Sequence, residues 1–185
     1  MDEADPMLPP PPDTKDWTWV LHEVCPECGV ESARIQPTDV PTLARANALI
    51  WESVLADDAA ARVRPSPEIW SPVEYACHVR DVFEVFTGRL QLMVAEDGAR
   101  FQNWDQDEAA VEGDYAHAEP SEVAVGVVAA AERVAAAWEA VPRDAWERQA
   151  VRSNGSVFTV TTLSQYFAHD WLHHAWDVTG VQPLL

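Results

Sequence analysis

Histidines gather near the C-terminal end of the sequence, in the stretch HDWLHHAWDV at residues 169–178. Three of the chain's six histidines lie there: His169, His173 and His174. On a helix, residues four apart are rotated by only about 40° and separated by about 6 Å along the axis, so His169 and His173 point the same way. Two imidazoles placed like this can hold one metal ion, as in the helical HxxxH pairs of zinc enzymes. His174 lies about 140° from His169, so we expect it outside this pair, on a face near a subunit contact.

A catalytic metal site needs a third ligand and open coordination positions. The best candidate is His78, in EYACHVRDVF, because it lies on the margin of an apolar helical stripe and should face the interior edge of a helical bundle. The spacing therefore favours a three-histidine site made by His78, His169 and His173. The alternative is that these histidines are half-buried and bonded to Asp170, Asp177 or backbone carbonyls.

Other side chains lie where they could complete such a site. Asp105, in the long loop sequence NWDQD, is the candidate base or substrate contact, since loops near bundle mouths often complete sites. A solvated turn residue or a helix cap is the alternative for Asp105. Its neighbour Trp104 could line the pocket or anchor the loop to the core. Tyr166 and Trp176 lie near the His169 face of the last helix and are candidate substrate contacts.

Charged residues beside the histidines have two candidate roles. Asp81 lies three residues after His78, and Asp177 lies four residues after His173. Either carboxylate could accept a hydrogen bond from a ligand imidazole, or be surface charge. An anionic or sugar-bearing substrate would also require cationic or hydrogen-bonding groups near the mouth of the site. By position, the candidates for substrate binding are Arg80, Arg152 and Asn154.

A second metal-like motif, CPECG, lies near the N-terminus. Cys25 and Cys28 have the spacing of a zinc knuckle, and His22 lies three residues before them. A closed structural zinc site needs four ligands, and the sequence has no second CxxC pair. Three interpretations stay open: a structural zinc with Cys25, Cys28 and His22, a redox-active pair or disulfide, and reduced thiols that pack a turn. Three cysteines in all are too few for a disulfide scaffold and are typical of a reducing compartment.

Four stretches with helical hydrophobic periodicity must position these side chains. The second has the clearest start, with Ser71 as N-cap and Glu74 completing a capping box. The last opens near Thr162, with Gln165 as partner in a second capping box, and ends at Gly180. The pattern predicts an all-α four-helix bundle with helices at 38–57, 71–96, 121–141 and 162–180.

The remaining segments differ in composition. Residues 1–16 are acidic and proline-rich, which predicts a disordered leader. Residues 17–37 predict an extended segment that ends in the CPECG turn and packs its tryptophans across the main domain, residues 38–185. Asn154-Gly155 between alternating residues predicts a small β-hairpin before the last helix.

Composition limits the partners and the compartment. The 185 residues carry a net charge of −19, and such a surface repels phosphate backbones and anionic lipid, so we expect a small-molecule substrate rather than nucleic acid or a membrane. The sequence has no long uncharged apolar run, and its acidic N-terminus is unlike a signal peptide, so we expect a cytoplasmic protein. The last helix is apolar nearly all round, which indicates deep burial or a homodimer interface.

The order of these parts resembles the DinB/YfiT-like superfamily of metal-dependent enzymes. The matching parts are a capped helix reading WSPVEYACHVRDV, a long loop with NWDQDE, an alanine-rich helix and a last helix with HDWLHH, over roughly residues 38–180. The resemblance implies a DinB-like four-helix bundle. It also implies that the metal ligands are one histidine of helix two and an HxxxH pair of helix four, which fall on His78, His169 and His173 here.

The resemblance further implies an activity. Related members are similar to thiol transferases that use bacterial thiols, and the family form favours mycothiol as cosubstrate and zinc or nickel as the divalent metal. A metal held by neutral imidazoles can activate a thiol or a water at neutral pH. We therefore expect mycothiol S-transfer onto an electrophilic small molecule. A metal-dependent hydrolase and a non-catalytic metal-binding scaffold are the alternatives.

Overall fold

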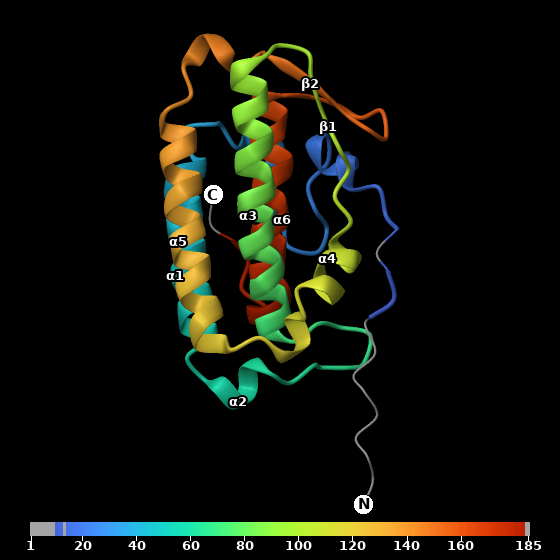
Figure 1. Cartoon of the computed structure of the whole chain (residues 1–185), viewed down its shortest axis with the longest axis vertical. Helices are drawn as coiled ribbons and strands as arrows, with labels where there is room; N and C mark the ends of the chain where they lie inside the picture. The colour runs from blue at the N-terminus through green and yellow to red at the C-terminus, as the bar shows by residue number, and fades with distance from the viewer. Residues whose placement is uncertain (1–9, 13, 184–185) are drawn as a thin grey trace, which may run out of the picture.

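Four long helices arranged as a bundle make up most of the chain, as the sequence predicts (Figure 1). They are α1 (Val40–Val54), α3 (Pro72–Ala95), α5 (Pro120–Glu139) and α6 (Val160–Thr179). The computed structural model describes residues 10–12 and 14–183, so most of the predicted leader lies outside the described residues. Both α5 and α6 pack against α1 and against α3, which gives the circular order α1–α5–α3–α6.

Helix caps explain where the two site-bearing helices begin. The predicted capping box of α3 is confirmed: Ser71 and Glu74 bond each other's backbone and side chain at the helix start. The predicted start of α6 is wrong, because its N-cap is Thr159, and Thr162 is the third helical residue that bonds back to it. Gln165 is buried and donates instead to backbone carbonyls of the N-terminal segment. Gly180, with a φ of 68°, ends α6 as predicted.

Shorter elements connect the bundle helices. They are the α-helices α2 (Asp58–Ala61) and α4 (Gln106–Glu112) and the 3-10 helices η1 (Trp17–Leu21), η2 (Ser32–Arg34), η3 (Tyr115–His117) and η4 (Arg143–Ala145). These elements are too short to produce a hydrophobic period that a sequence shows clearly. The long loop around NWDQD, which lies between the second and third predicted helices, therefore contains α4 and η3.

A small sheet covers one end of the bundle. The predicted hairpin is confirmed: β2 (Gln149–Arg152) pairs antiparallel with β3 (Val157–Thr159), and Gly155 turns with a φ of 95°. A third strand, β1 (Ala99–Phe101), pairs parallel with β2. Figure 1 shows the strands, α4 and the N-terminal segment on one side of the bundle, next to α3 and α6. This is the side that carries the predicted site residues.

The core accounts for the apolar character of α6. Phe167 and Trp171 are completely buried and pack their rings against Phe83 of α3. Burial inside one chain thus explains the helix pattern, and the homodimer stays a prediction. Among the described residues, no helix combines the length and the apolarity that a membrane span requires.

The N-terminal segment is folded rather than extended. It forms η1 and η2, both of which pack on α6, with Val20, Val30 and Ile35 buried beneath them. Trp17 and Trp19 contact His169 of α6, so the tryptophans lie across the main domain as predicted. The segment is therefore part of the surroundings of the last helix and of its histidines.

Candidate metal centre

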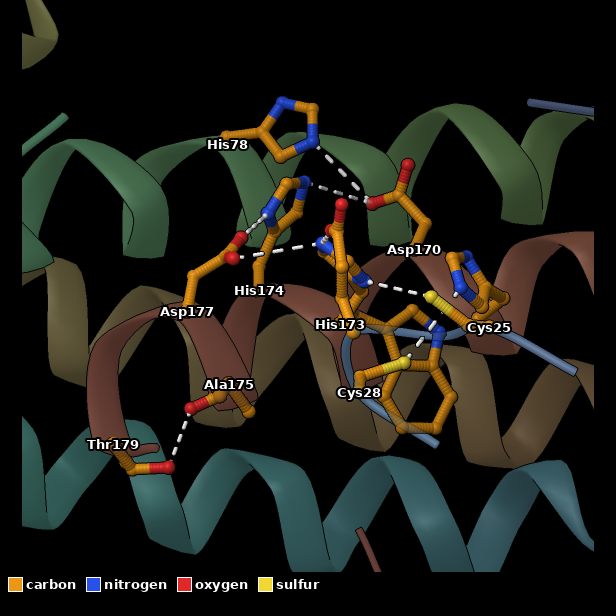
Figure 2. Close-up of polar contacts among 12 residues, drawn as sticks. Cys25, Cys28, His78, Asp170, His173, His174, Ala175, Asp177 and Thr179 are labelled. Atoms are coloured by element: carbon orange, nitrogen blue, oxygen red, sulfur yellow. Dashed lines mark hydrogen bonds and ion pairs between the residues drawn. The ribbon is translucent and has the colours of Figure 1, made fainter. Parts of the chain in front are cut away.

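Two histidines and an aspartate converge between α3 and α6. His78 comes from α3, and Asp170 and His174 lie four apart on α6, so both face α3. The Asp170 Oδ1 atom lies 3.3 Å from His78 Nε2 and 3.9 Å from His174 Nε2 (Figure 2). The three ligand atoms all lie within 4.8 Å of one another. We call these three residues the His–Asp–His group.

Burial makes this group suited to a cation. His78 is fully buried. Apart from the ion-pair contacts of Asp170 Oδ1 with the two imidazoles, neither the His78 ring nitrogens nor Asp170 Oδ1 has a hydrogen-bond partner among the described residues. Burial lowers the pKa of His78, and the Asp170 carboxylate only partly opposes this, so the imidazole is neutral at neutral pH. Neutral imidazoles and a carboxylate are ligands of divalent metals, and buried polar atoms without partners are costly unless something binds them.

Neighbouring side chains fix the orientation of the imidazoles. The His174 Nδ1 atom lies 2.8 Å from Asp177 Oδ2, which leaves Nε2 directed toward Asp170. The ring of His78 stacks on Trp104, with centroids 5.6 Å apart and an interplanar angle of 18°. Carboxylate partners of this kind set the tautomer and raise the basicity of metal-binding histidines.

A cavity of about 440 Å³ opens beside the group, with Asp170 in its lining. This is the size of pocket that holds a small-molecule ligand. A second cavity, of about 80 Å³, shares Trp17, Gln106, Tyr166 and Asp170 with the first and also touches His174. A ligand in the larger cavity therefore has access to the carboxylate of the His–Asp–His group.

His169 and His173 belong to another cluster. Their ring nitrogens face the thiols of the CPECG turn: His173 Nδ1 is 3.6 Å from Cys25 Sγ, and His169 Nε2 is 3.8 Å from Cys28 Sγ (Figure 2). All four residues are buried, and their ligand atoms lie within 4.8 Å of one another. We call these four residues the Cys–His group. The two groups occupy adjacent positions along α6.

The chain is similar to known proteins both in sequence and in fold. The family model described as the DinB superfamily matches residues 42–176. The chain belongs to the DinB superfamily. No curated protein matches the chain.

Three solved structures share the bundle fold of this chain. YfiT from Bacillus subtilis, described as "a probable metal-dependent hydrolase with an unusual four-helix bundle topology", is 15% identical, with a TM-score of 0.69 over 78% of this chain and 84% of its own. Two structures of mycothiol-dependent maleylpyruvate isomerase, one of them a mutant, are 15% and 14% identical, with TM-scores of 0.65 and 0.62. Each covers 82% of this chain, which spans only 66% of the isomerase. At such identities the likeness establishes the fold alone.

The structure divides the predicted trio of histidines. His78 lies in the His–Asp–His group, whereas His169 and His173 lie with the two cysteines. His174 lies outside the His169–His173 pair, as its angle on the helix predicts, and instead supplies the α6 side of the His–Asp–His group together with Asp170. The sequence contains a second pair four residues apart, Asp170 and His174, each one residue after His169 and His173. This pair was missed because its first member is an aspartate.

The candidate zinc set at CPECG also changes. Cys25 and Cys28 are buried and form no disulfide, and their neighbours are the α6 histidines rather than His22. His22 is exposed at the end of η1 and belongs to neither group. Sequence spacing could not reveal the real neighbours, because they lie more than a hundred residues away.

Asp105 and two aromatic candidates line the cavity. Asp105 is the N-cap of α4, and its Oδ1 accepts from the backbone of Asp107 and Glu108. We therefore assign Asp105 to capping rather than to catalysis. Trp104 and Tyr166 lie in the lining, in agreement with a role as pocket walls.

The other candidates lie elsewhere. Arg80 pairs with Asp81 at 2.8 Å, and Asp81 also accepts from the Tyr115 hydroxyl, so neither residue bonds His78 or lines the two cavities. Trp176 packs on His173 with centroids 5.4 Å apart, at the Cys–His group. Of the predicted carboxylate partners, Asp177 is the one that contacts candidate ligands.

Two buried arginines line the larger cavity, together with Lys15 and four aspartates: Asp16, Asp105, Asp107 and Asp170. Arg89 and Arg152 are each 7% exposed, and both line the larger cavity. Burial, and then the charge of Arg152, lower the pKa of Arg89 to about 10. Within the described part of the chain, both guanidiniums donate hydrogen bonds to neutral groups, such as the Gln102 carbonyl and Asn154. Sequence position suggested Arg152, whereas Arg89 was missed because it lies within an apolar helical face.

Proposed function

We propose that this DinB protein is a divalent-metal-dependent enzyme that acts on an anionic small molecule. In this proposal His78, Asp170 and His174 hold the metal, and the substrate occupies the adjoining cavity. The observation that carries it is the convergence of three ligand atoms, two of them buried and without hydrogen-bond partners outside the group, beside a cavity lined by two buried arginines.

The chain's own residues bind and orient the reactants. When bound, a divalent metal lowers the pKa of a coordinated water or thiol, so that a nucleophile is available at neutral pH. Arg89 and Arg152 offer charged donors to a carboxylate or similar anion. Burial raises the pKa of Tyr166, so its hydroxyl keeps its proton and can donate to the substrate. Trp17 and Trp104 form walls that restrict water.

The reaction class favoured here is thiol transfer from mycothiol to an electrophilic acceptor. Its support is the shared fold with mycothiol-dependent maleylpyruvate isomerase. The acceptor would be the anion held by Arg89 and Arg152, with the thiol beside Asp170. Zinc and nickel are the metals proposed, because two imidazoles and one carboxylate suit both.

A specific observation favours hydrolysis as the second candidate. Two histidines with one carboxylate form the donor set of zinc hydrolases that activate water. The similar YfiT is also described as a probable metal-dependent hydrolase. The two candidates share the metal site and differ in the nucleophile.

One assay separates them. The purified chain, loaded with zinc or nickel, is incubated with mycothiol and monochlorobimane, and separately with p-nitrophenyl esters without thiol. We expect metal-dependent conjugation that His78→Ala abolishes and that Arg143→Met, an exposed substitution, leaves unchanged. Ester cleavage without thiol would favour the hydrolase. Loss of both activities with the metal still bound would point to a scaffold.

A further inference from the structure

We propose that Cys25, Cys28, His169 and His173 form a second metal site, a closed structural zinc site that fastens the N-terminal segment to α6. The site is separate from the His–Asp–His group and does not depend on the proposed reaction. It joins a turn near residue 25 to the last helix of the bundle, two parts of the chain that sequence spacing does not connect.

The distances fit a tetrahedral zinc ion. With Zn–S near 2.3 Å and Zn–N near 2.0–2.1 Å, tetrahedral angles place sulfur and nitrogen about 3.6 Å apart. The structure places Cys25 Sγ 3.6 Å from His173 Nδ1 and Cys28 Sγ 3.8 Å from His169 Nε2. These separations match two edges of a zinc tetrahedron.

The backbone around the cysteines has the form of a knuckle. The Gly29 N–H donates to the Cys25 carbonyl and the Cys25 N–H to the Val30 carbonyl, each at 2.9 Å. Gly29 has a φ of 76°, a conformation that a residue with a Cβ rarely adopts. The turn thus directs both thiols inward, toward α6, where both are almost fully buried.

Charge and burial also point to a bound cation. Cys25 and Cys28 are both almost fully buried, so a thiolate at either position requires a bound cation beside it. Zinc binding displaces two thiol protons to solvent, and one Zn²⁺ with two thiolates and two neutral imidazoles has no net charge. A neutral centre is what a buried site requires.

Neighbouring carboxylates select the nitrogen that faces the metal. His173 Nε2 lies 3.3 Å from Glu27 Oε2 and 3.5 Å from Asp177 Oδ1, so its Nδ1 is left for the thiol side. Asp177 uses its other oxygen for His174 of the His–Asp–His group. One carboxylate therefore orients a ligand of each site (Figure 2).

The zinc would position one wall of the cavity. Lys15, Asp16 and Trp17 line the larger cavity, and Trp17 begins η1, which leads to the turn that carries the cysteines. Trp17 also stands against both histidines of the Cys–His group, with ring centroids 5.8 Å from His169 and 5.3 Å from His173. Fixing the turn on α6 therefore fixes the wall against which the substrate packs.

Zinc content tests the proposal in the full-length chain. Zinc per chain is measured by mass spectrometry after reconstitution with zinc alone, in the wild type, Cys25→Ser/Cys28→Ser and Cys77→Ala. Cys77 is buried but belongs to neither group, so its variant is the matched control. We expect the double variant to hold one zinc fewer than the wild type and the control to hold the same number. Equal zinc in all three overturns the proposal.

The difference of one zinc, rather than the total, is the readout. If the His–Asp–His group holds no metal, the wild type holds one zinc and the double variant holds none. Failure of the proposed function is therefore distinguishable from failure of the structural zinc site. If the double variant does not fold, cobalt(II) added to the wild type decides. We expect thiolate-to-cobalt charge-transfer absorption, absent after alkylation of the cysteines. No such absorption, or a Cys25–Cys28 disulfide in the isolated protein, overturns the proposal.

Discussion

Replacing Arg89 by methionine tests whether the cavity is built to bind an anion. Arg89 lies between two aromatic rings, with its guanidinium carbon 4.6 Å from the Phe86 centroid and 4.7 Å from the Phe101 centroid. Among the described residues, Arg89 donates a hydrogen bond to the Gln102 carbonyl, at 3.2 Å. Methionine keeps most of the apolar contact with the rings and removes the charge together with the guanidinium hydrogen-bond donors.

The structure gives the size of the effect on stability. The fall in the pKa of Arg89 from 12.5 to about 10 is equivalent to about 3 kcal/mol, at about 1.36 kcal/mol per pKa unit. A lowered pKa of a base means that folding disfavours its charged form, so this penalty applies at every pH below about 10. Losing the carbonyl bond costs about 1 kcal/mol and losing the cation–π contacts about 1 kcal/mol more. Arg89→Met should therefore be as stable as the wild type or about 1 kcal/mol more stable.

Binding should change in the opposite direction. A hydrogen bond from a charged donor contributes about 1.5–3 kcal/mol, so affinity for a dicarboxylate should fall roughly 10- to 100-fold. Urea unfolding measures the stability, and calorimetric titration with malonate, succinate and glutarate measures the affinity. Arg143→Met, an exposed arginine over a tryptophan ring, is the matched control. A loss of more than about 3 kcal/mol of stability with unchanged anion affinity would show that Arg89 stabilises the fold and does not bind the anion.

Three further predictions concern the surroundings of the site. Burial alone would raise the pKa of Glu74, but Arg64 and Ser71 more than offset this and lower the pKa. The folded state therefore gains stability above pH about 4.5, and this gain is lost as the pH falls through the folded pKa. Glu74→Gln should cost about 3 kcal/mol at pH 7 in urea unfolding, and the cost should shrink as the pH is lowered. Asp177→Asn should weaken zinc binding at both groups about tenfold in chelator competition, whereas an effect on one group alone would contradict the shared role. Gly29→Ala should lower stability by about 1 kcal/mol, seen as a lower melting temperature, because its φ is 76°.

The bundle could be predicted from the sequence because its signals are local. Ser71 and Glu74 lie three apart and fix the start of α3, and the alternation around Asn154-Gly155 fixes the hairpin. The start of α6 was misplaced because Thr159 and Thr162 both have capping side chains, and tertiary contacts of Gln165 decide between them. β1 was missed since three residues that pair with a distant strand have no period of their own.

The site was predicted only in part, for a geometric reason. The spacing of four correctly places His169 beside His173, but the same spacing holds for Asp170 and His174, and a sequence does not say which pair faces α3. The answer depends on the rotation of α6, which is set by the burial of Phe167 and Trp171. The Cys–His group depends on how residues 17–37 fold back on the helix.

We propose that His78, Asp170 and His174 bind the catalytic metal, and anomalous diffraction would locate that metal directly. Crystals of the zinc- or nickel-loaded chain are measured on both sides of the absorption edge of the bound metal. We expect an anomalous peak in contact with His78 Nε2, Asp170 Oδ1 and His174 Nε2, separate from any peak between the cysteines and His169. A loaded crystal with no peak at these three atoms, or with one shared by His78, His169 and His173, would contradict it.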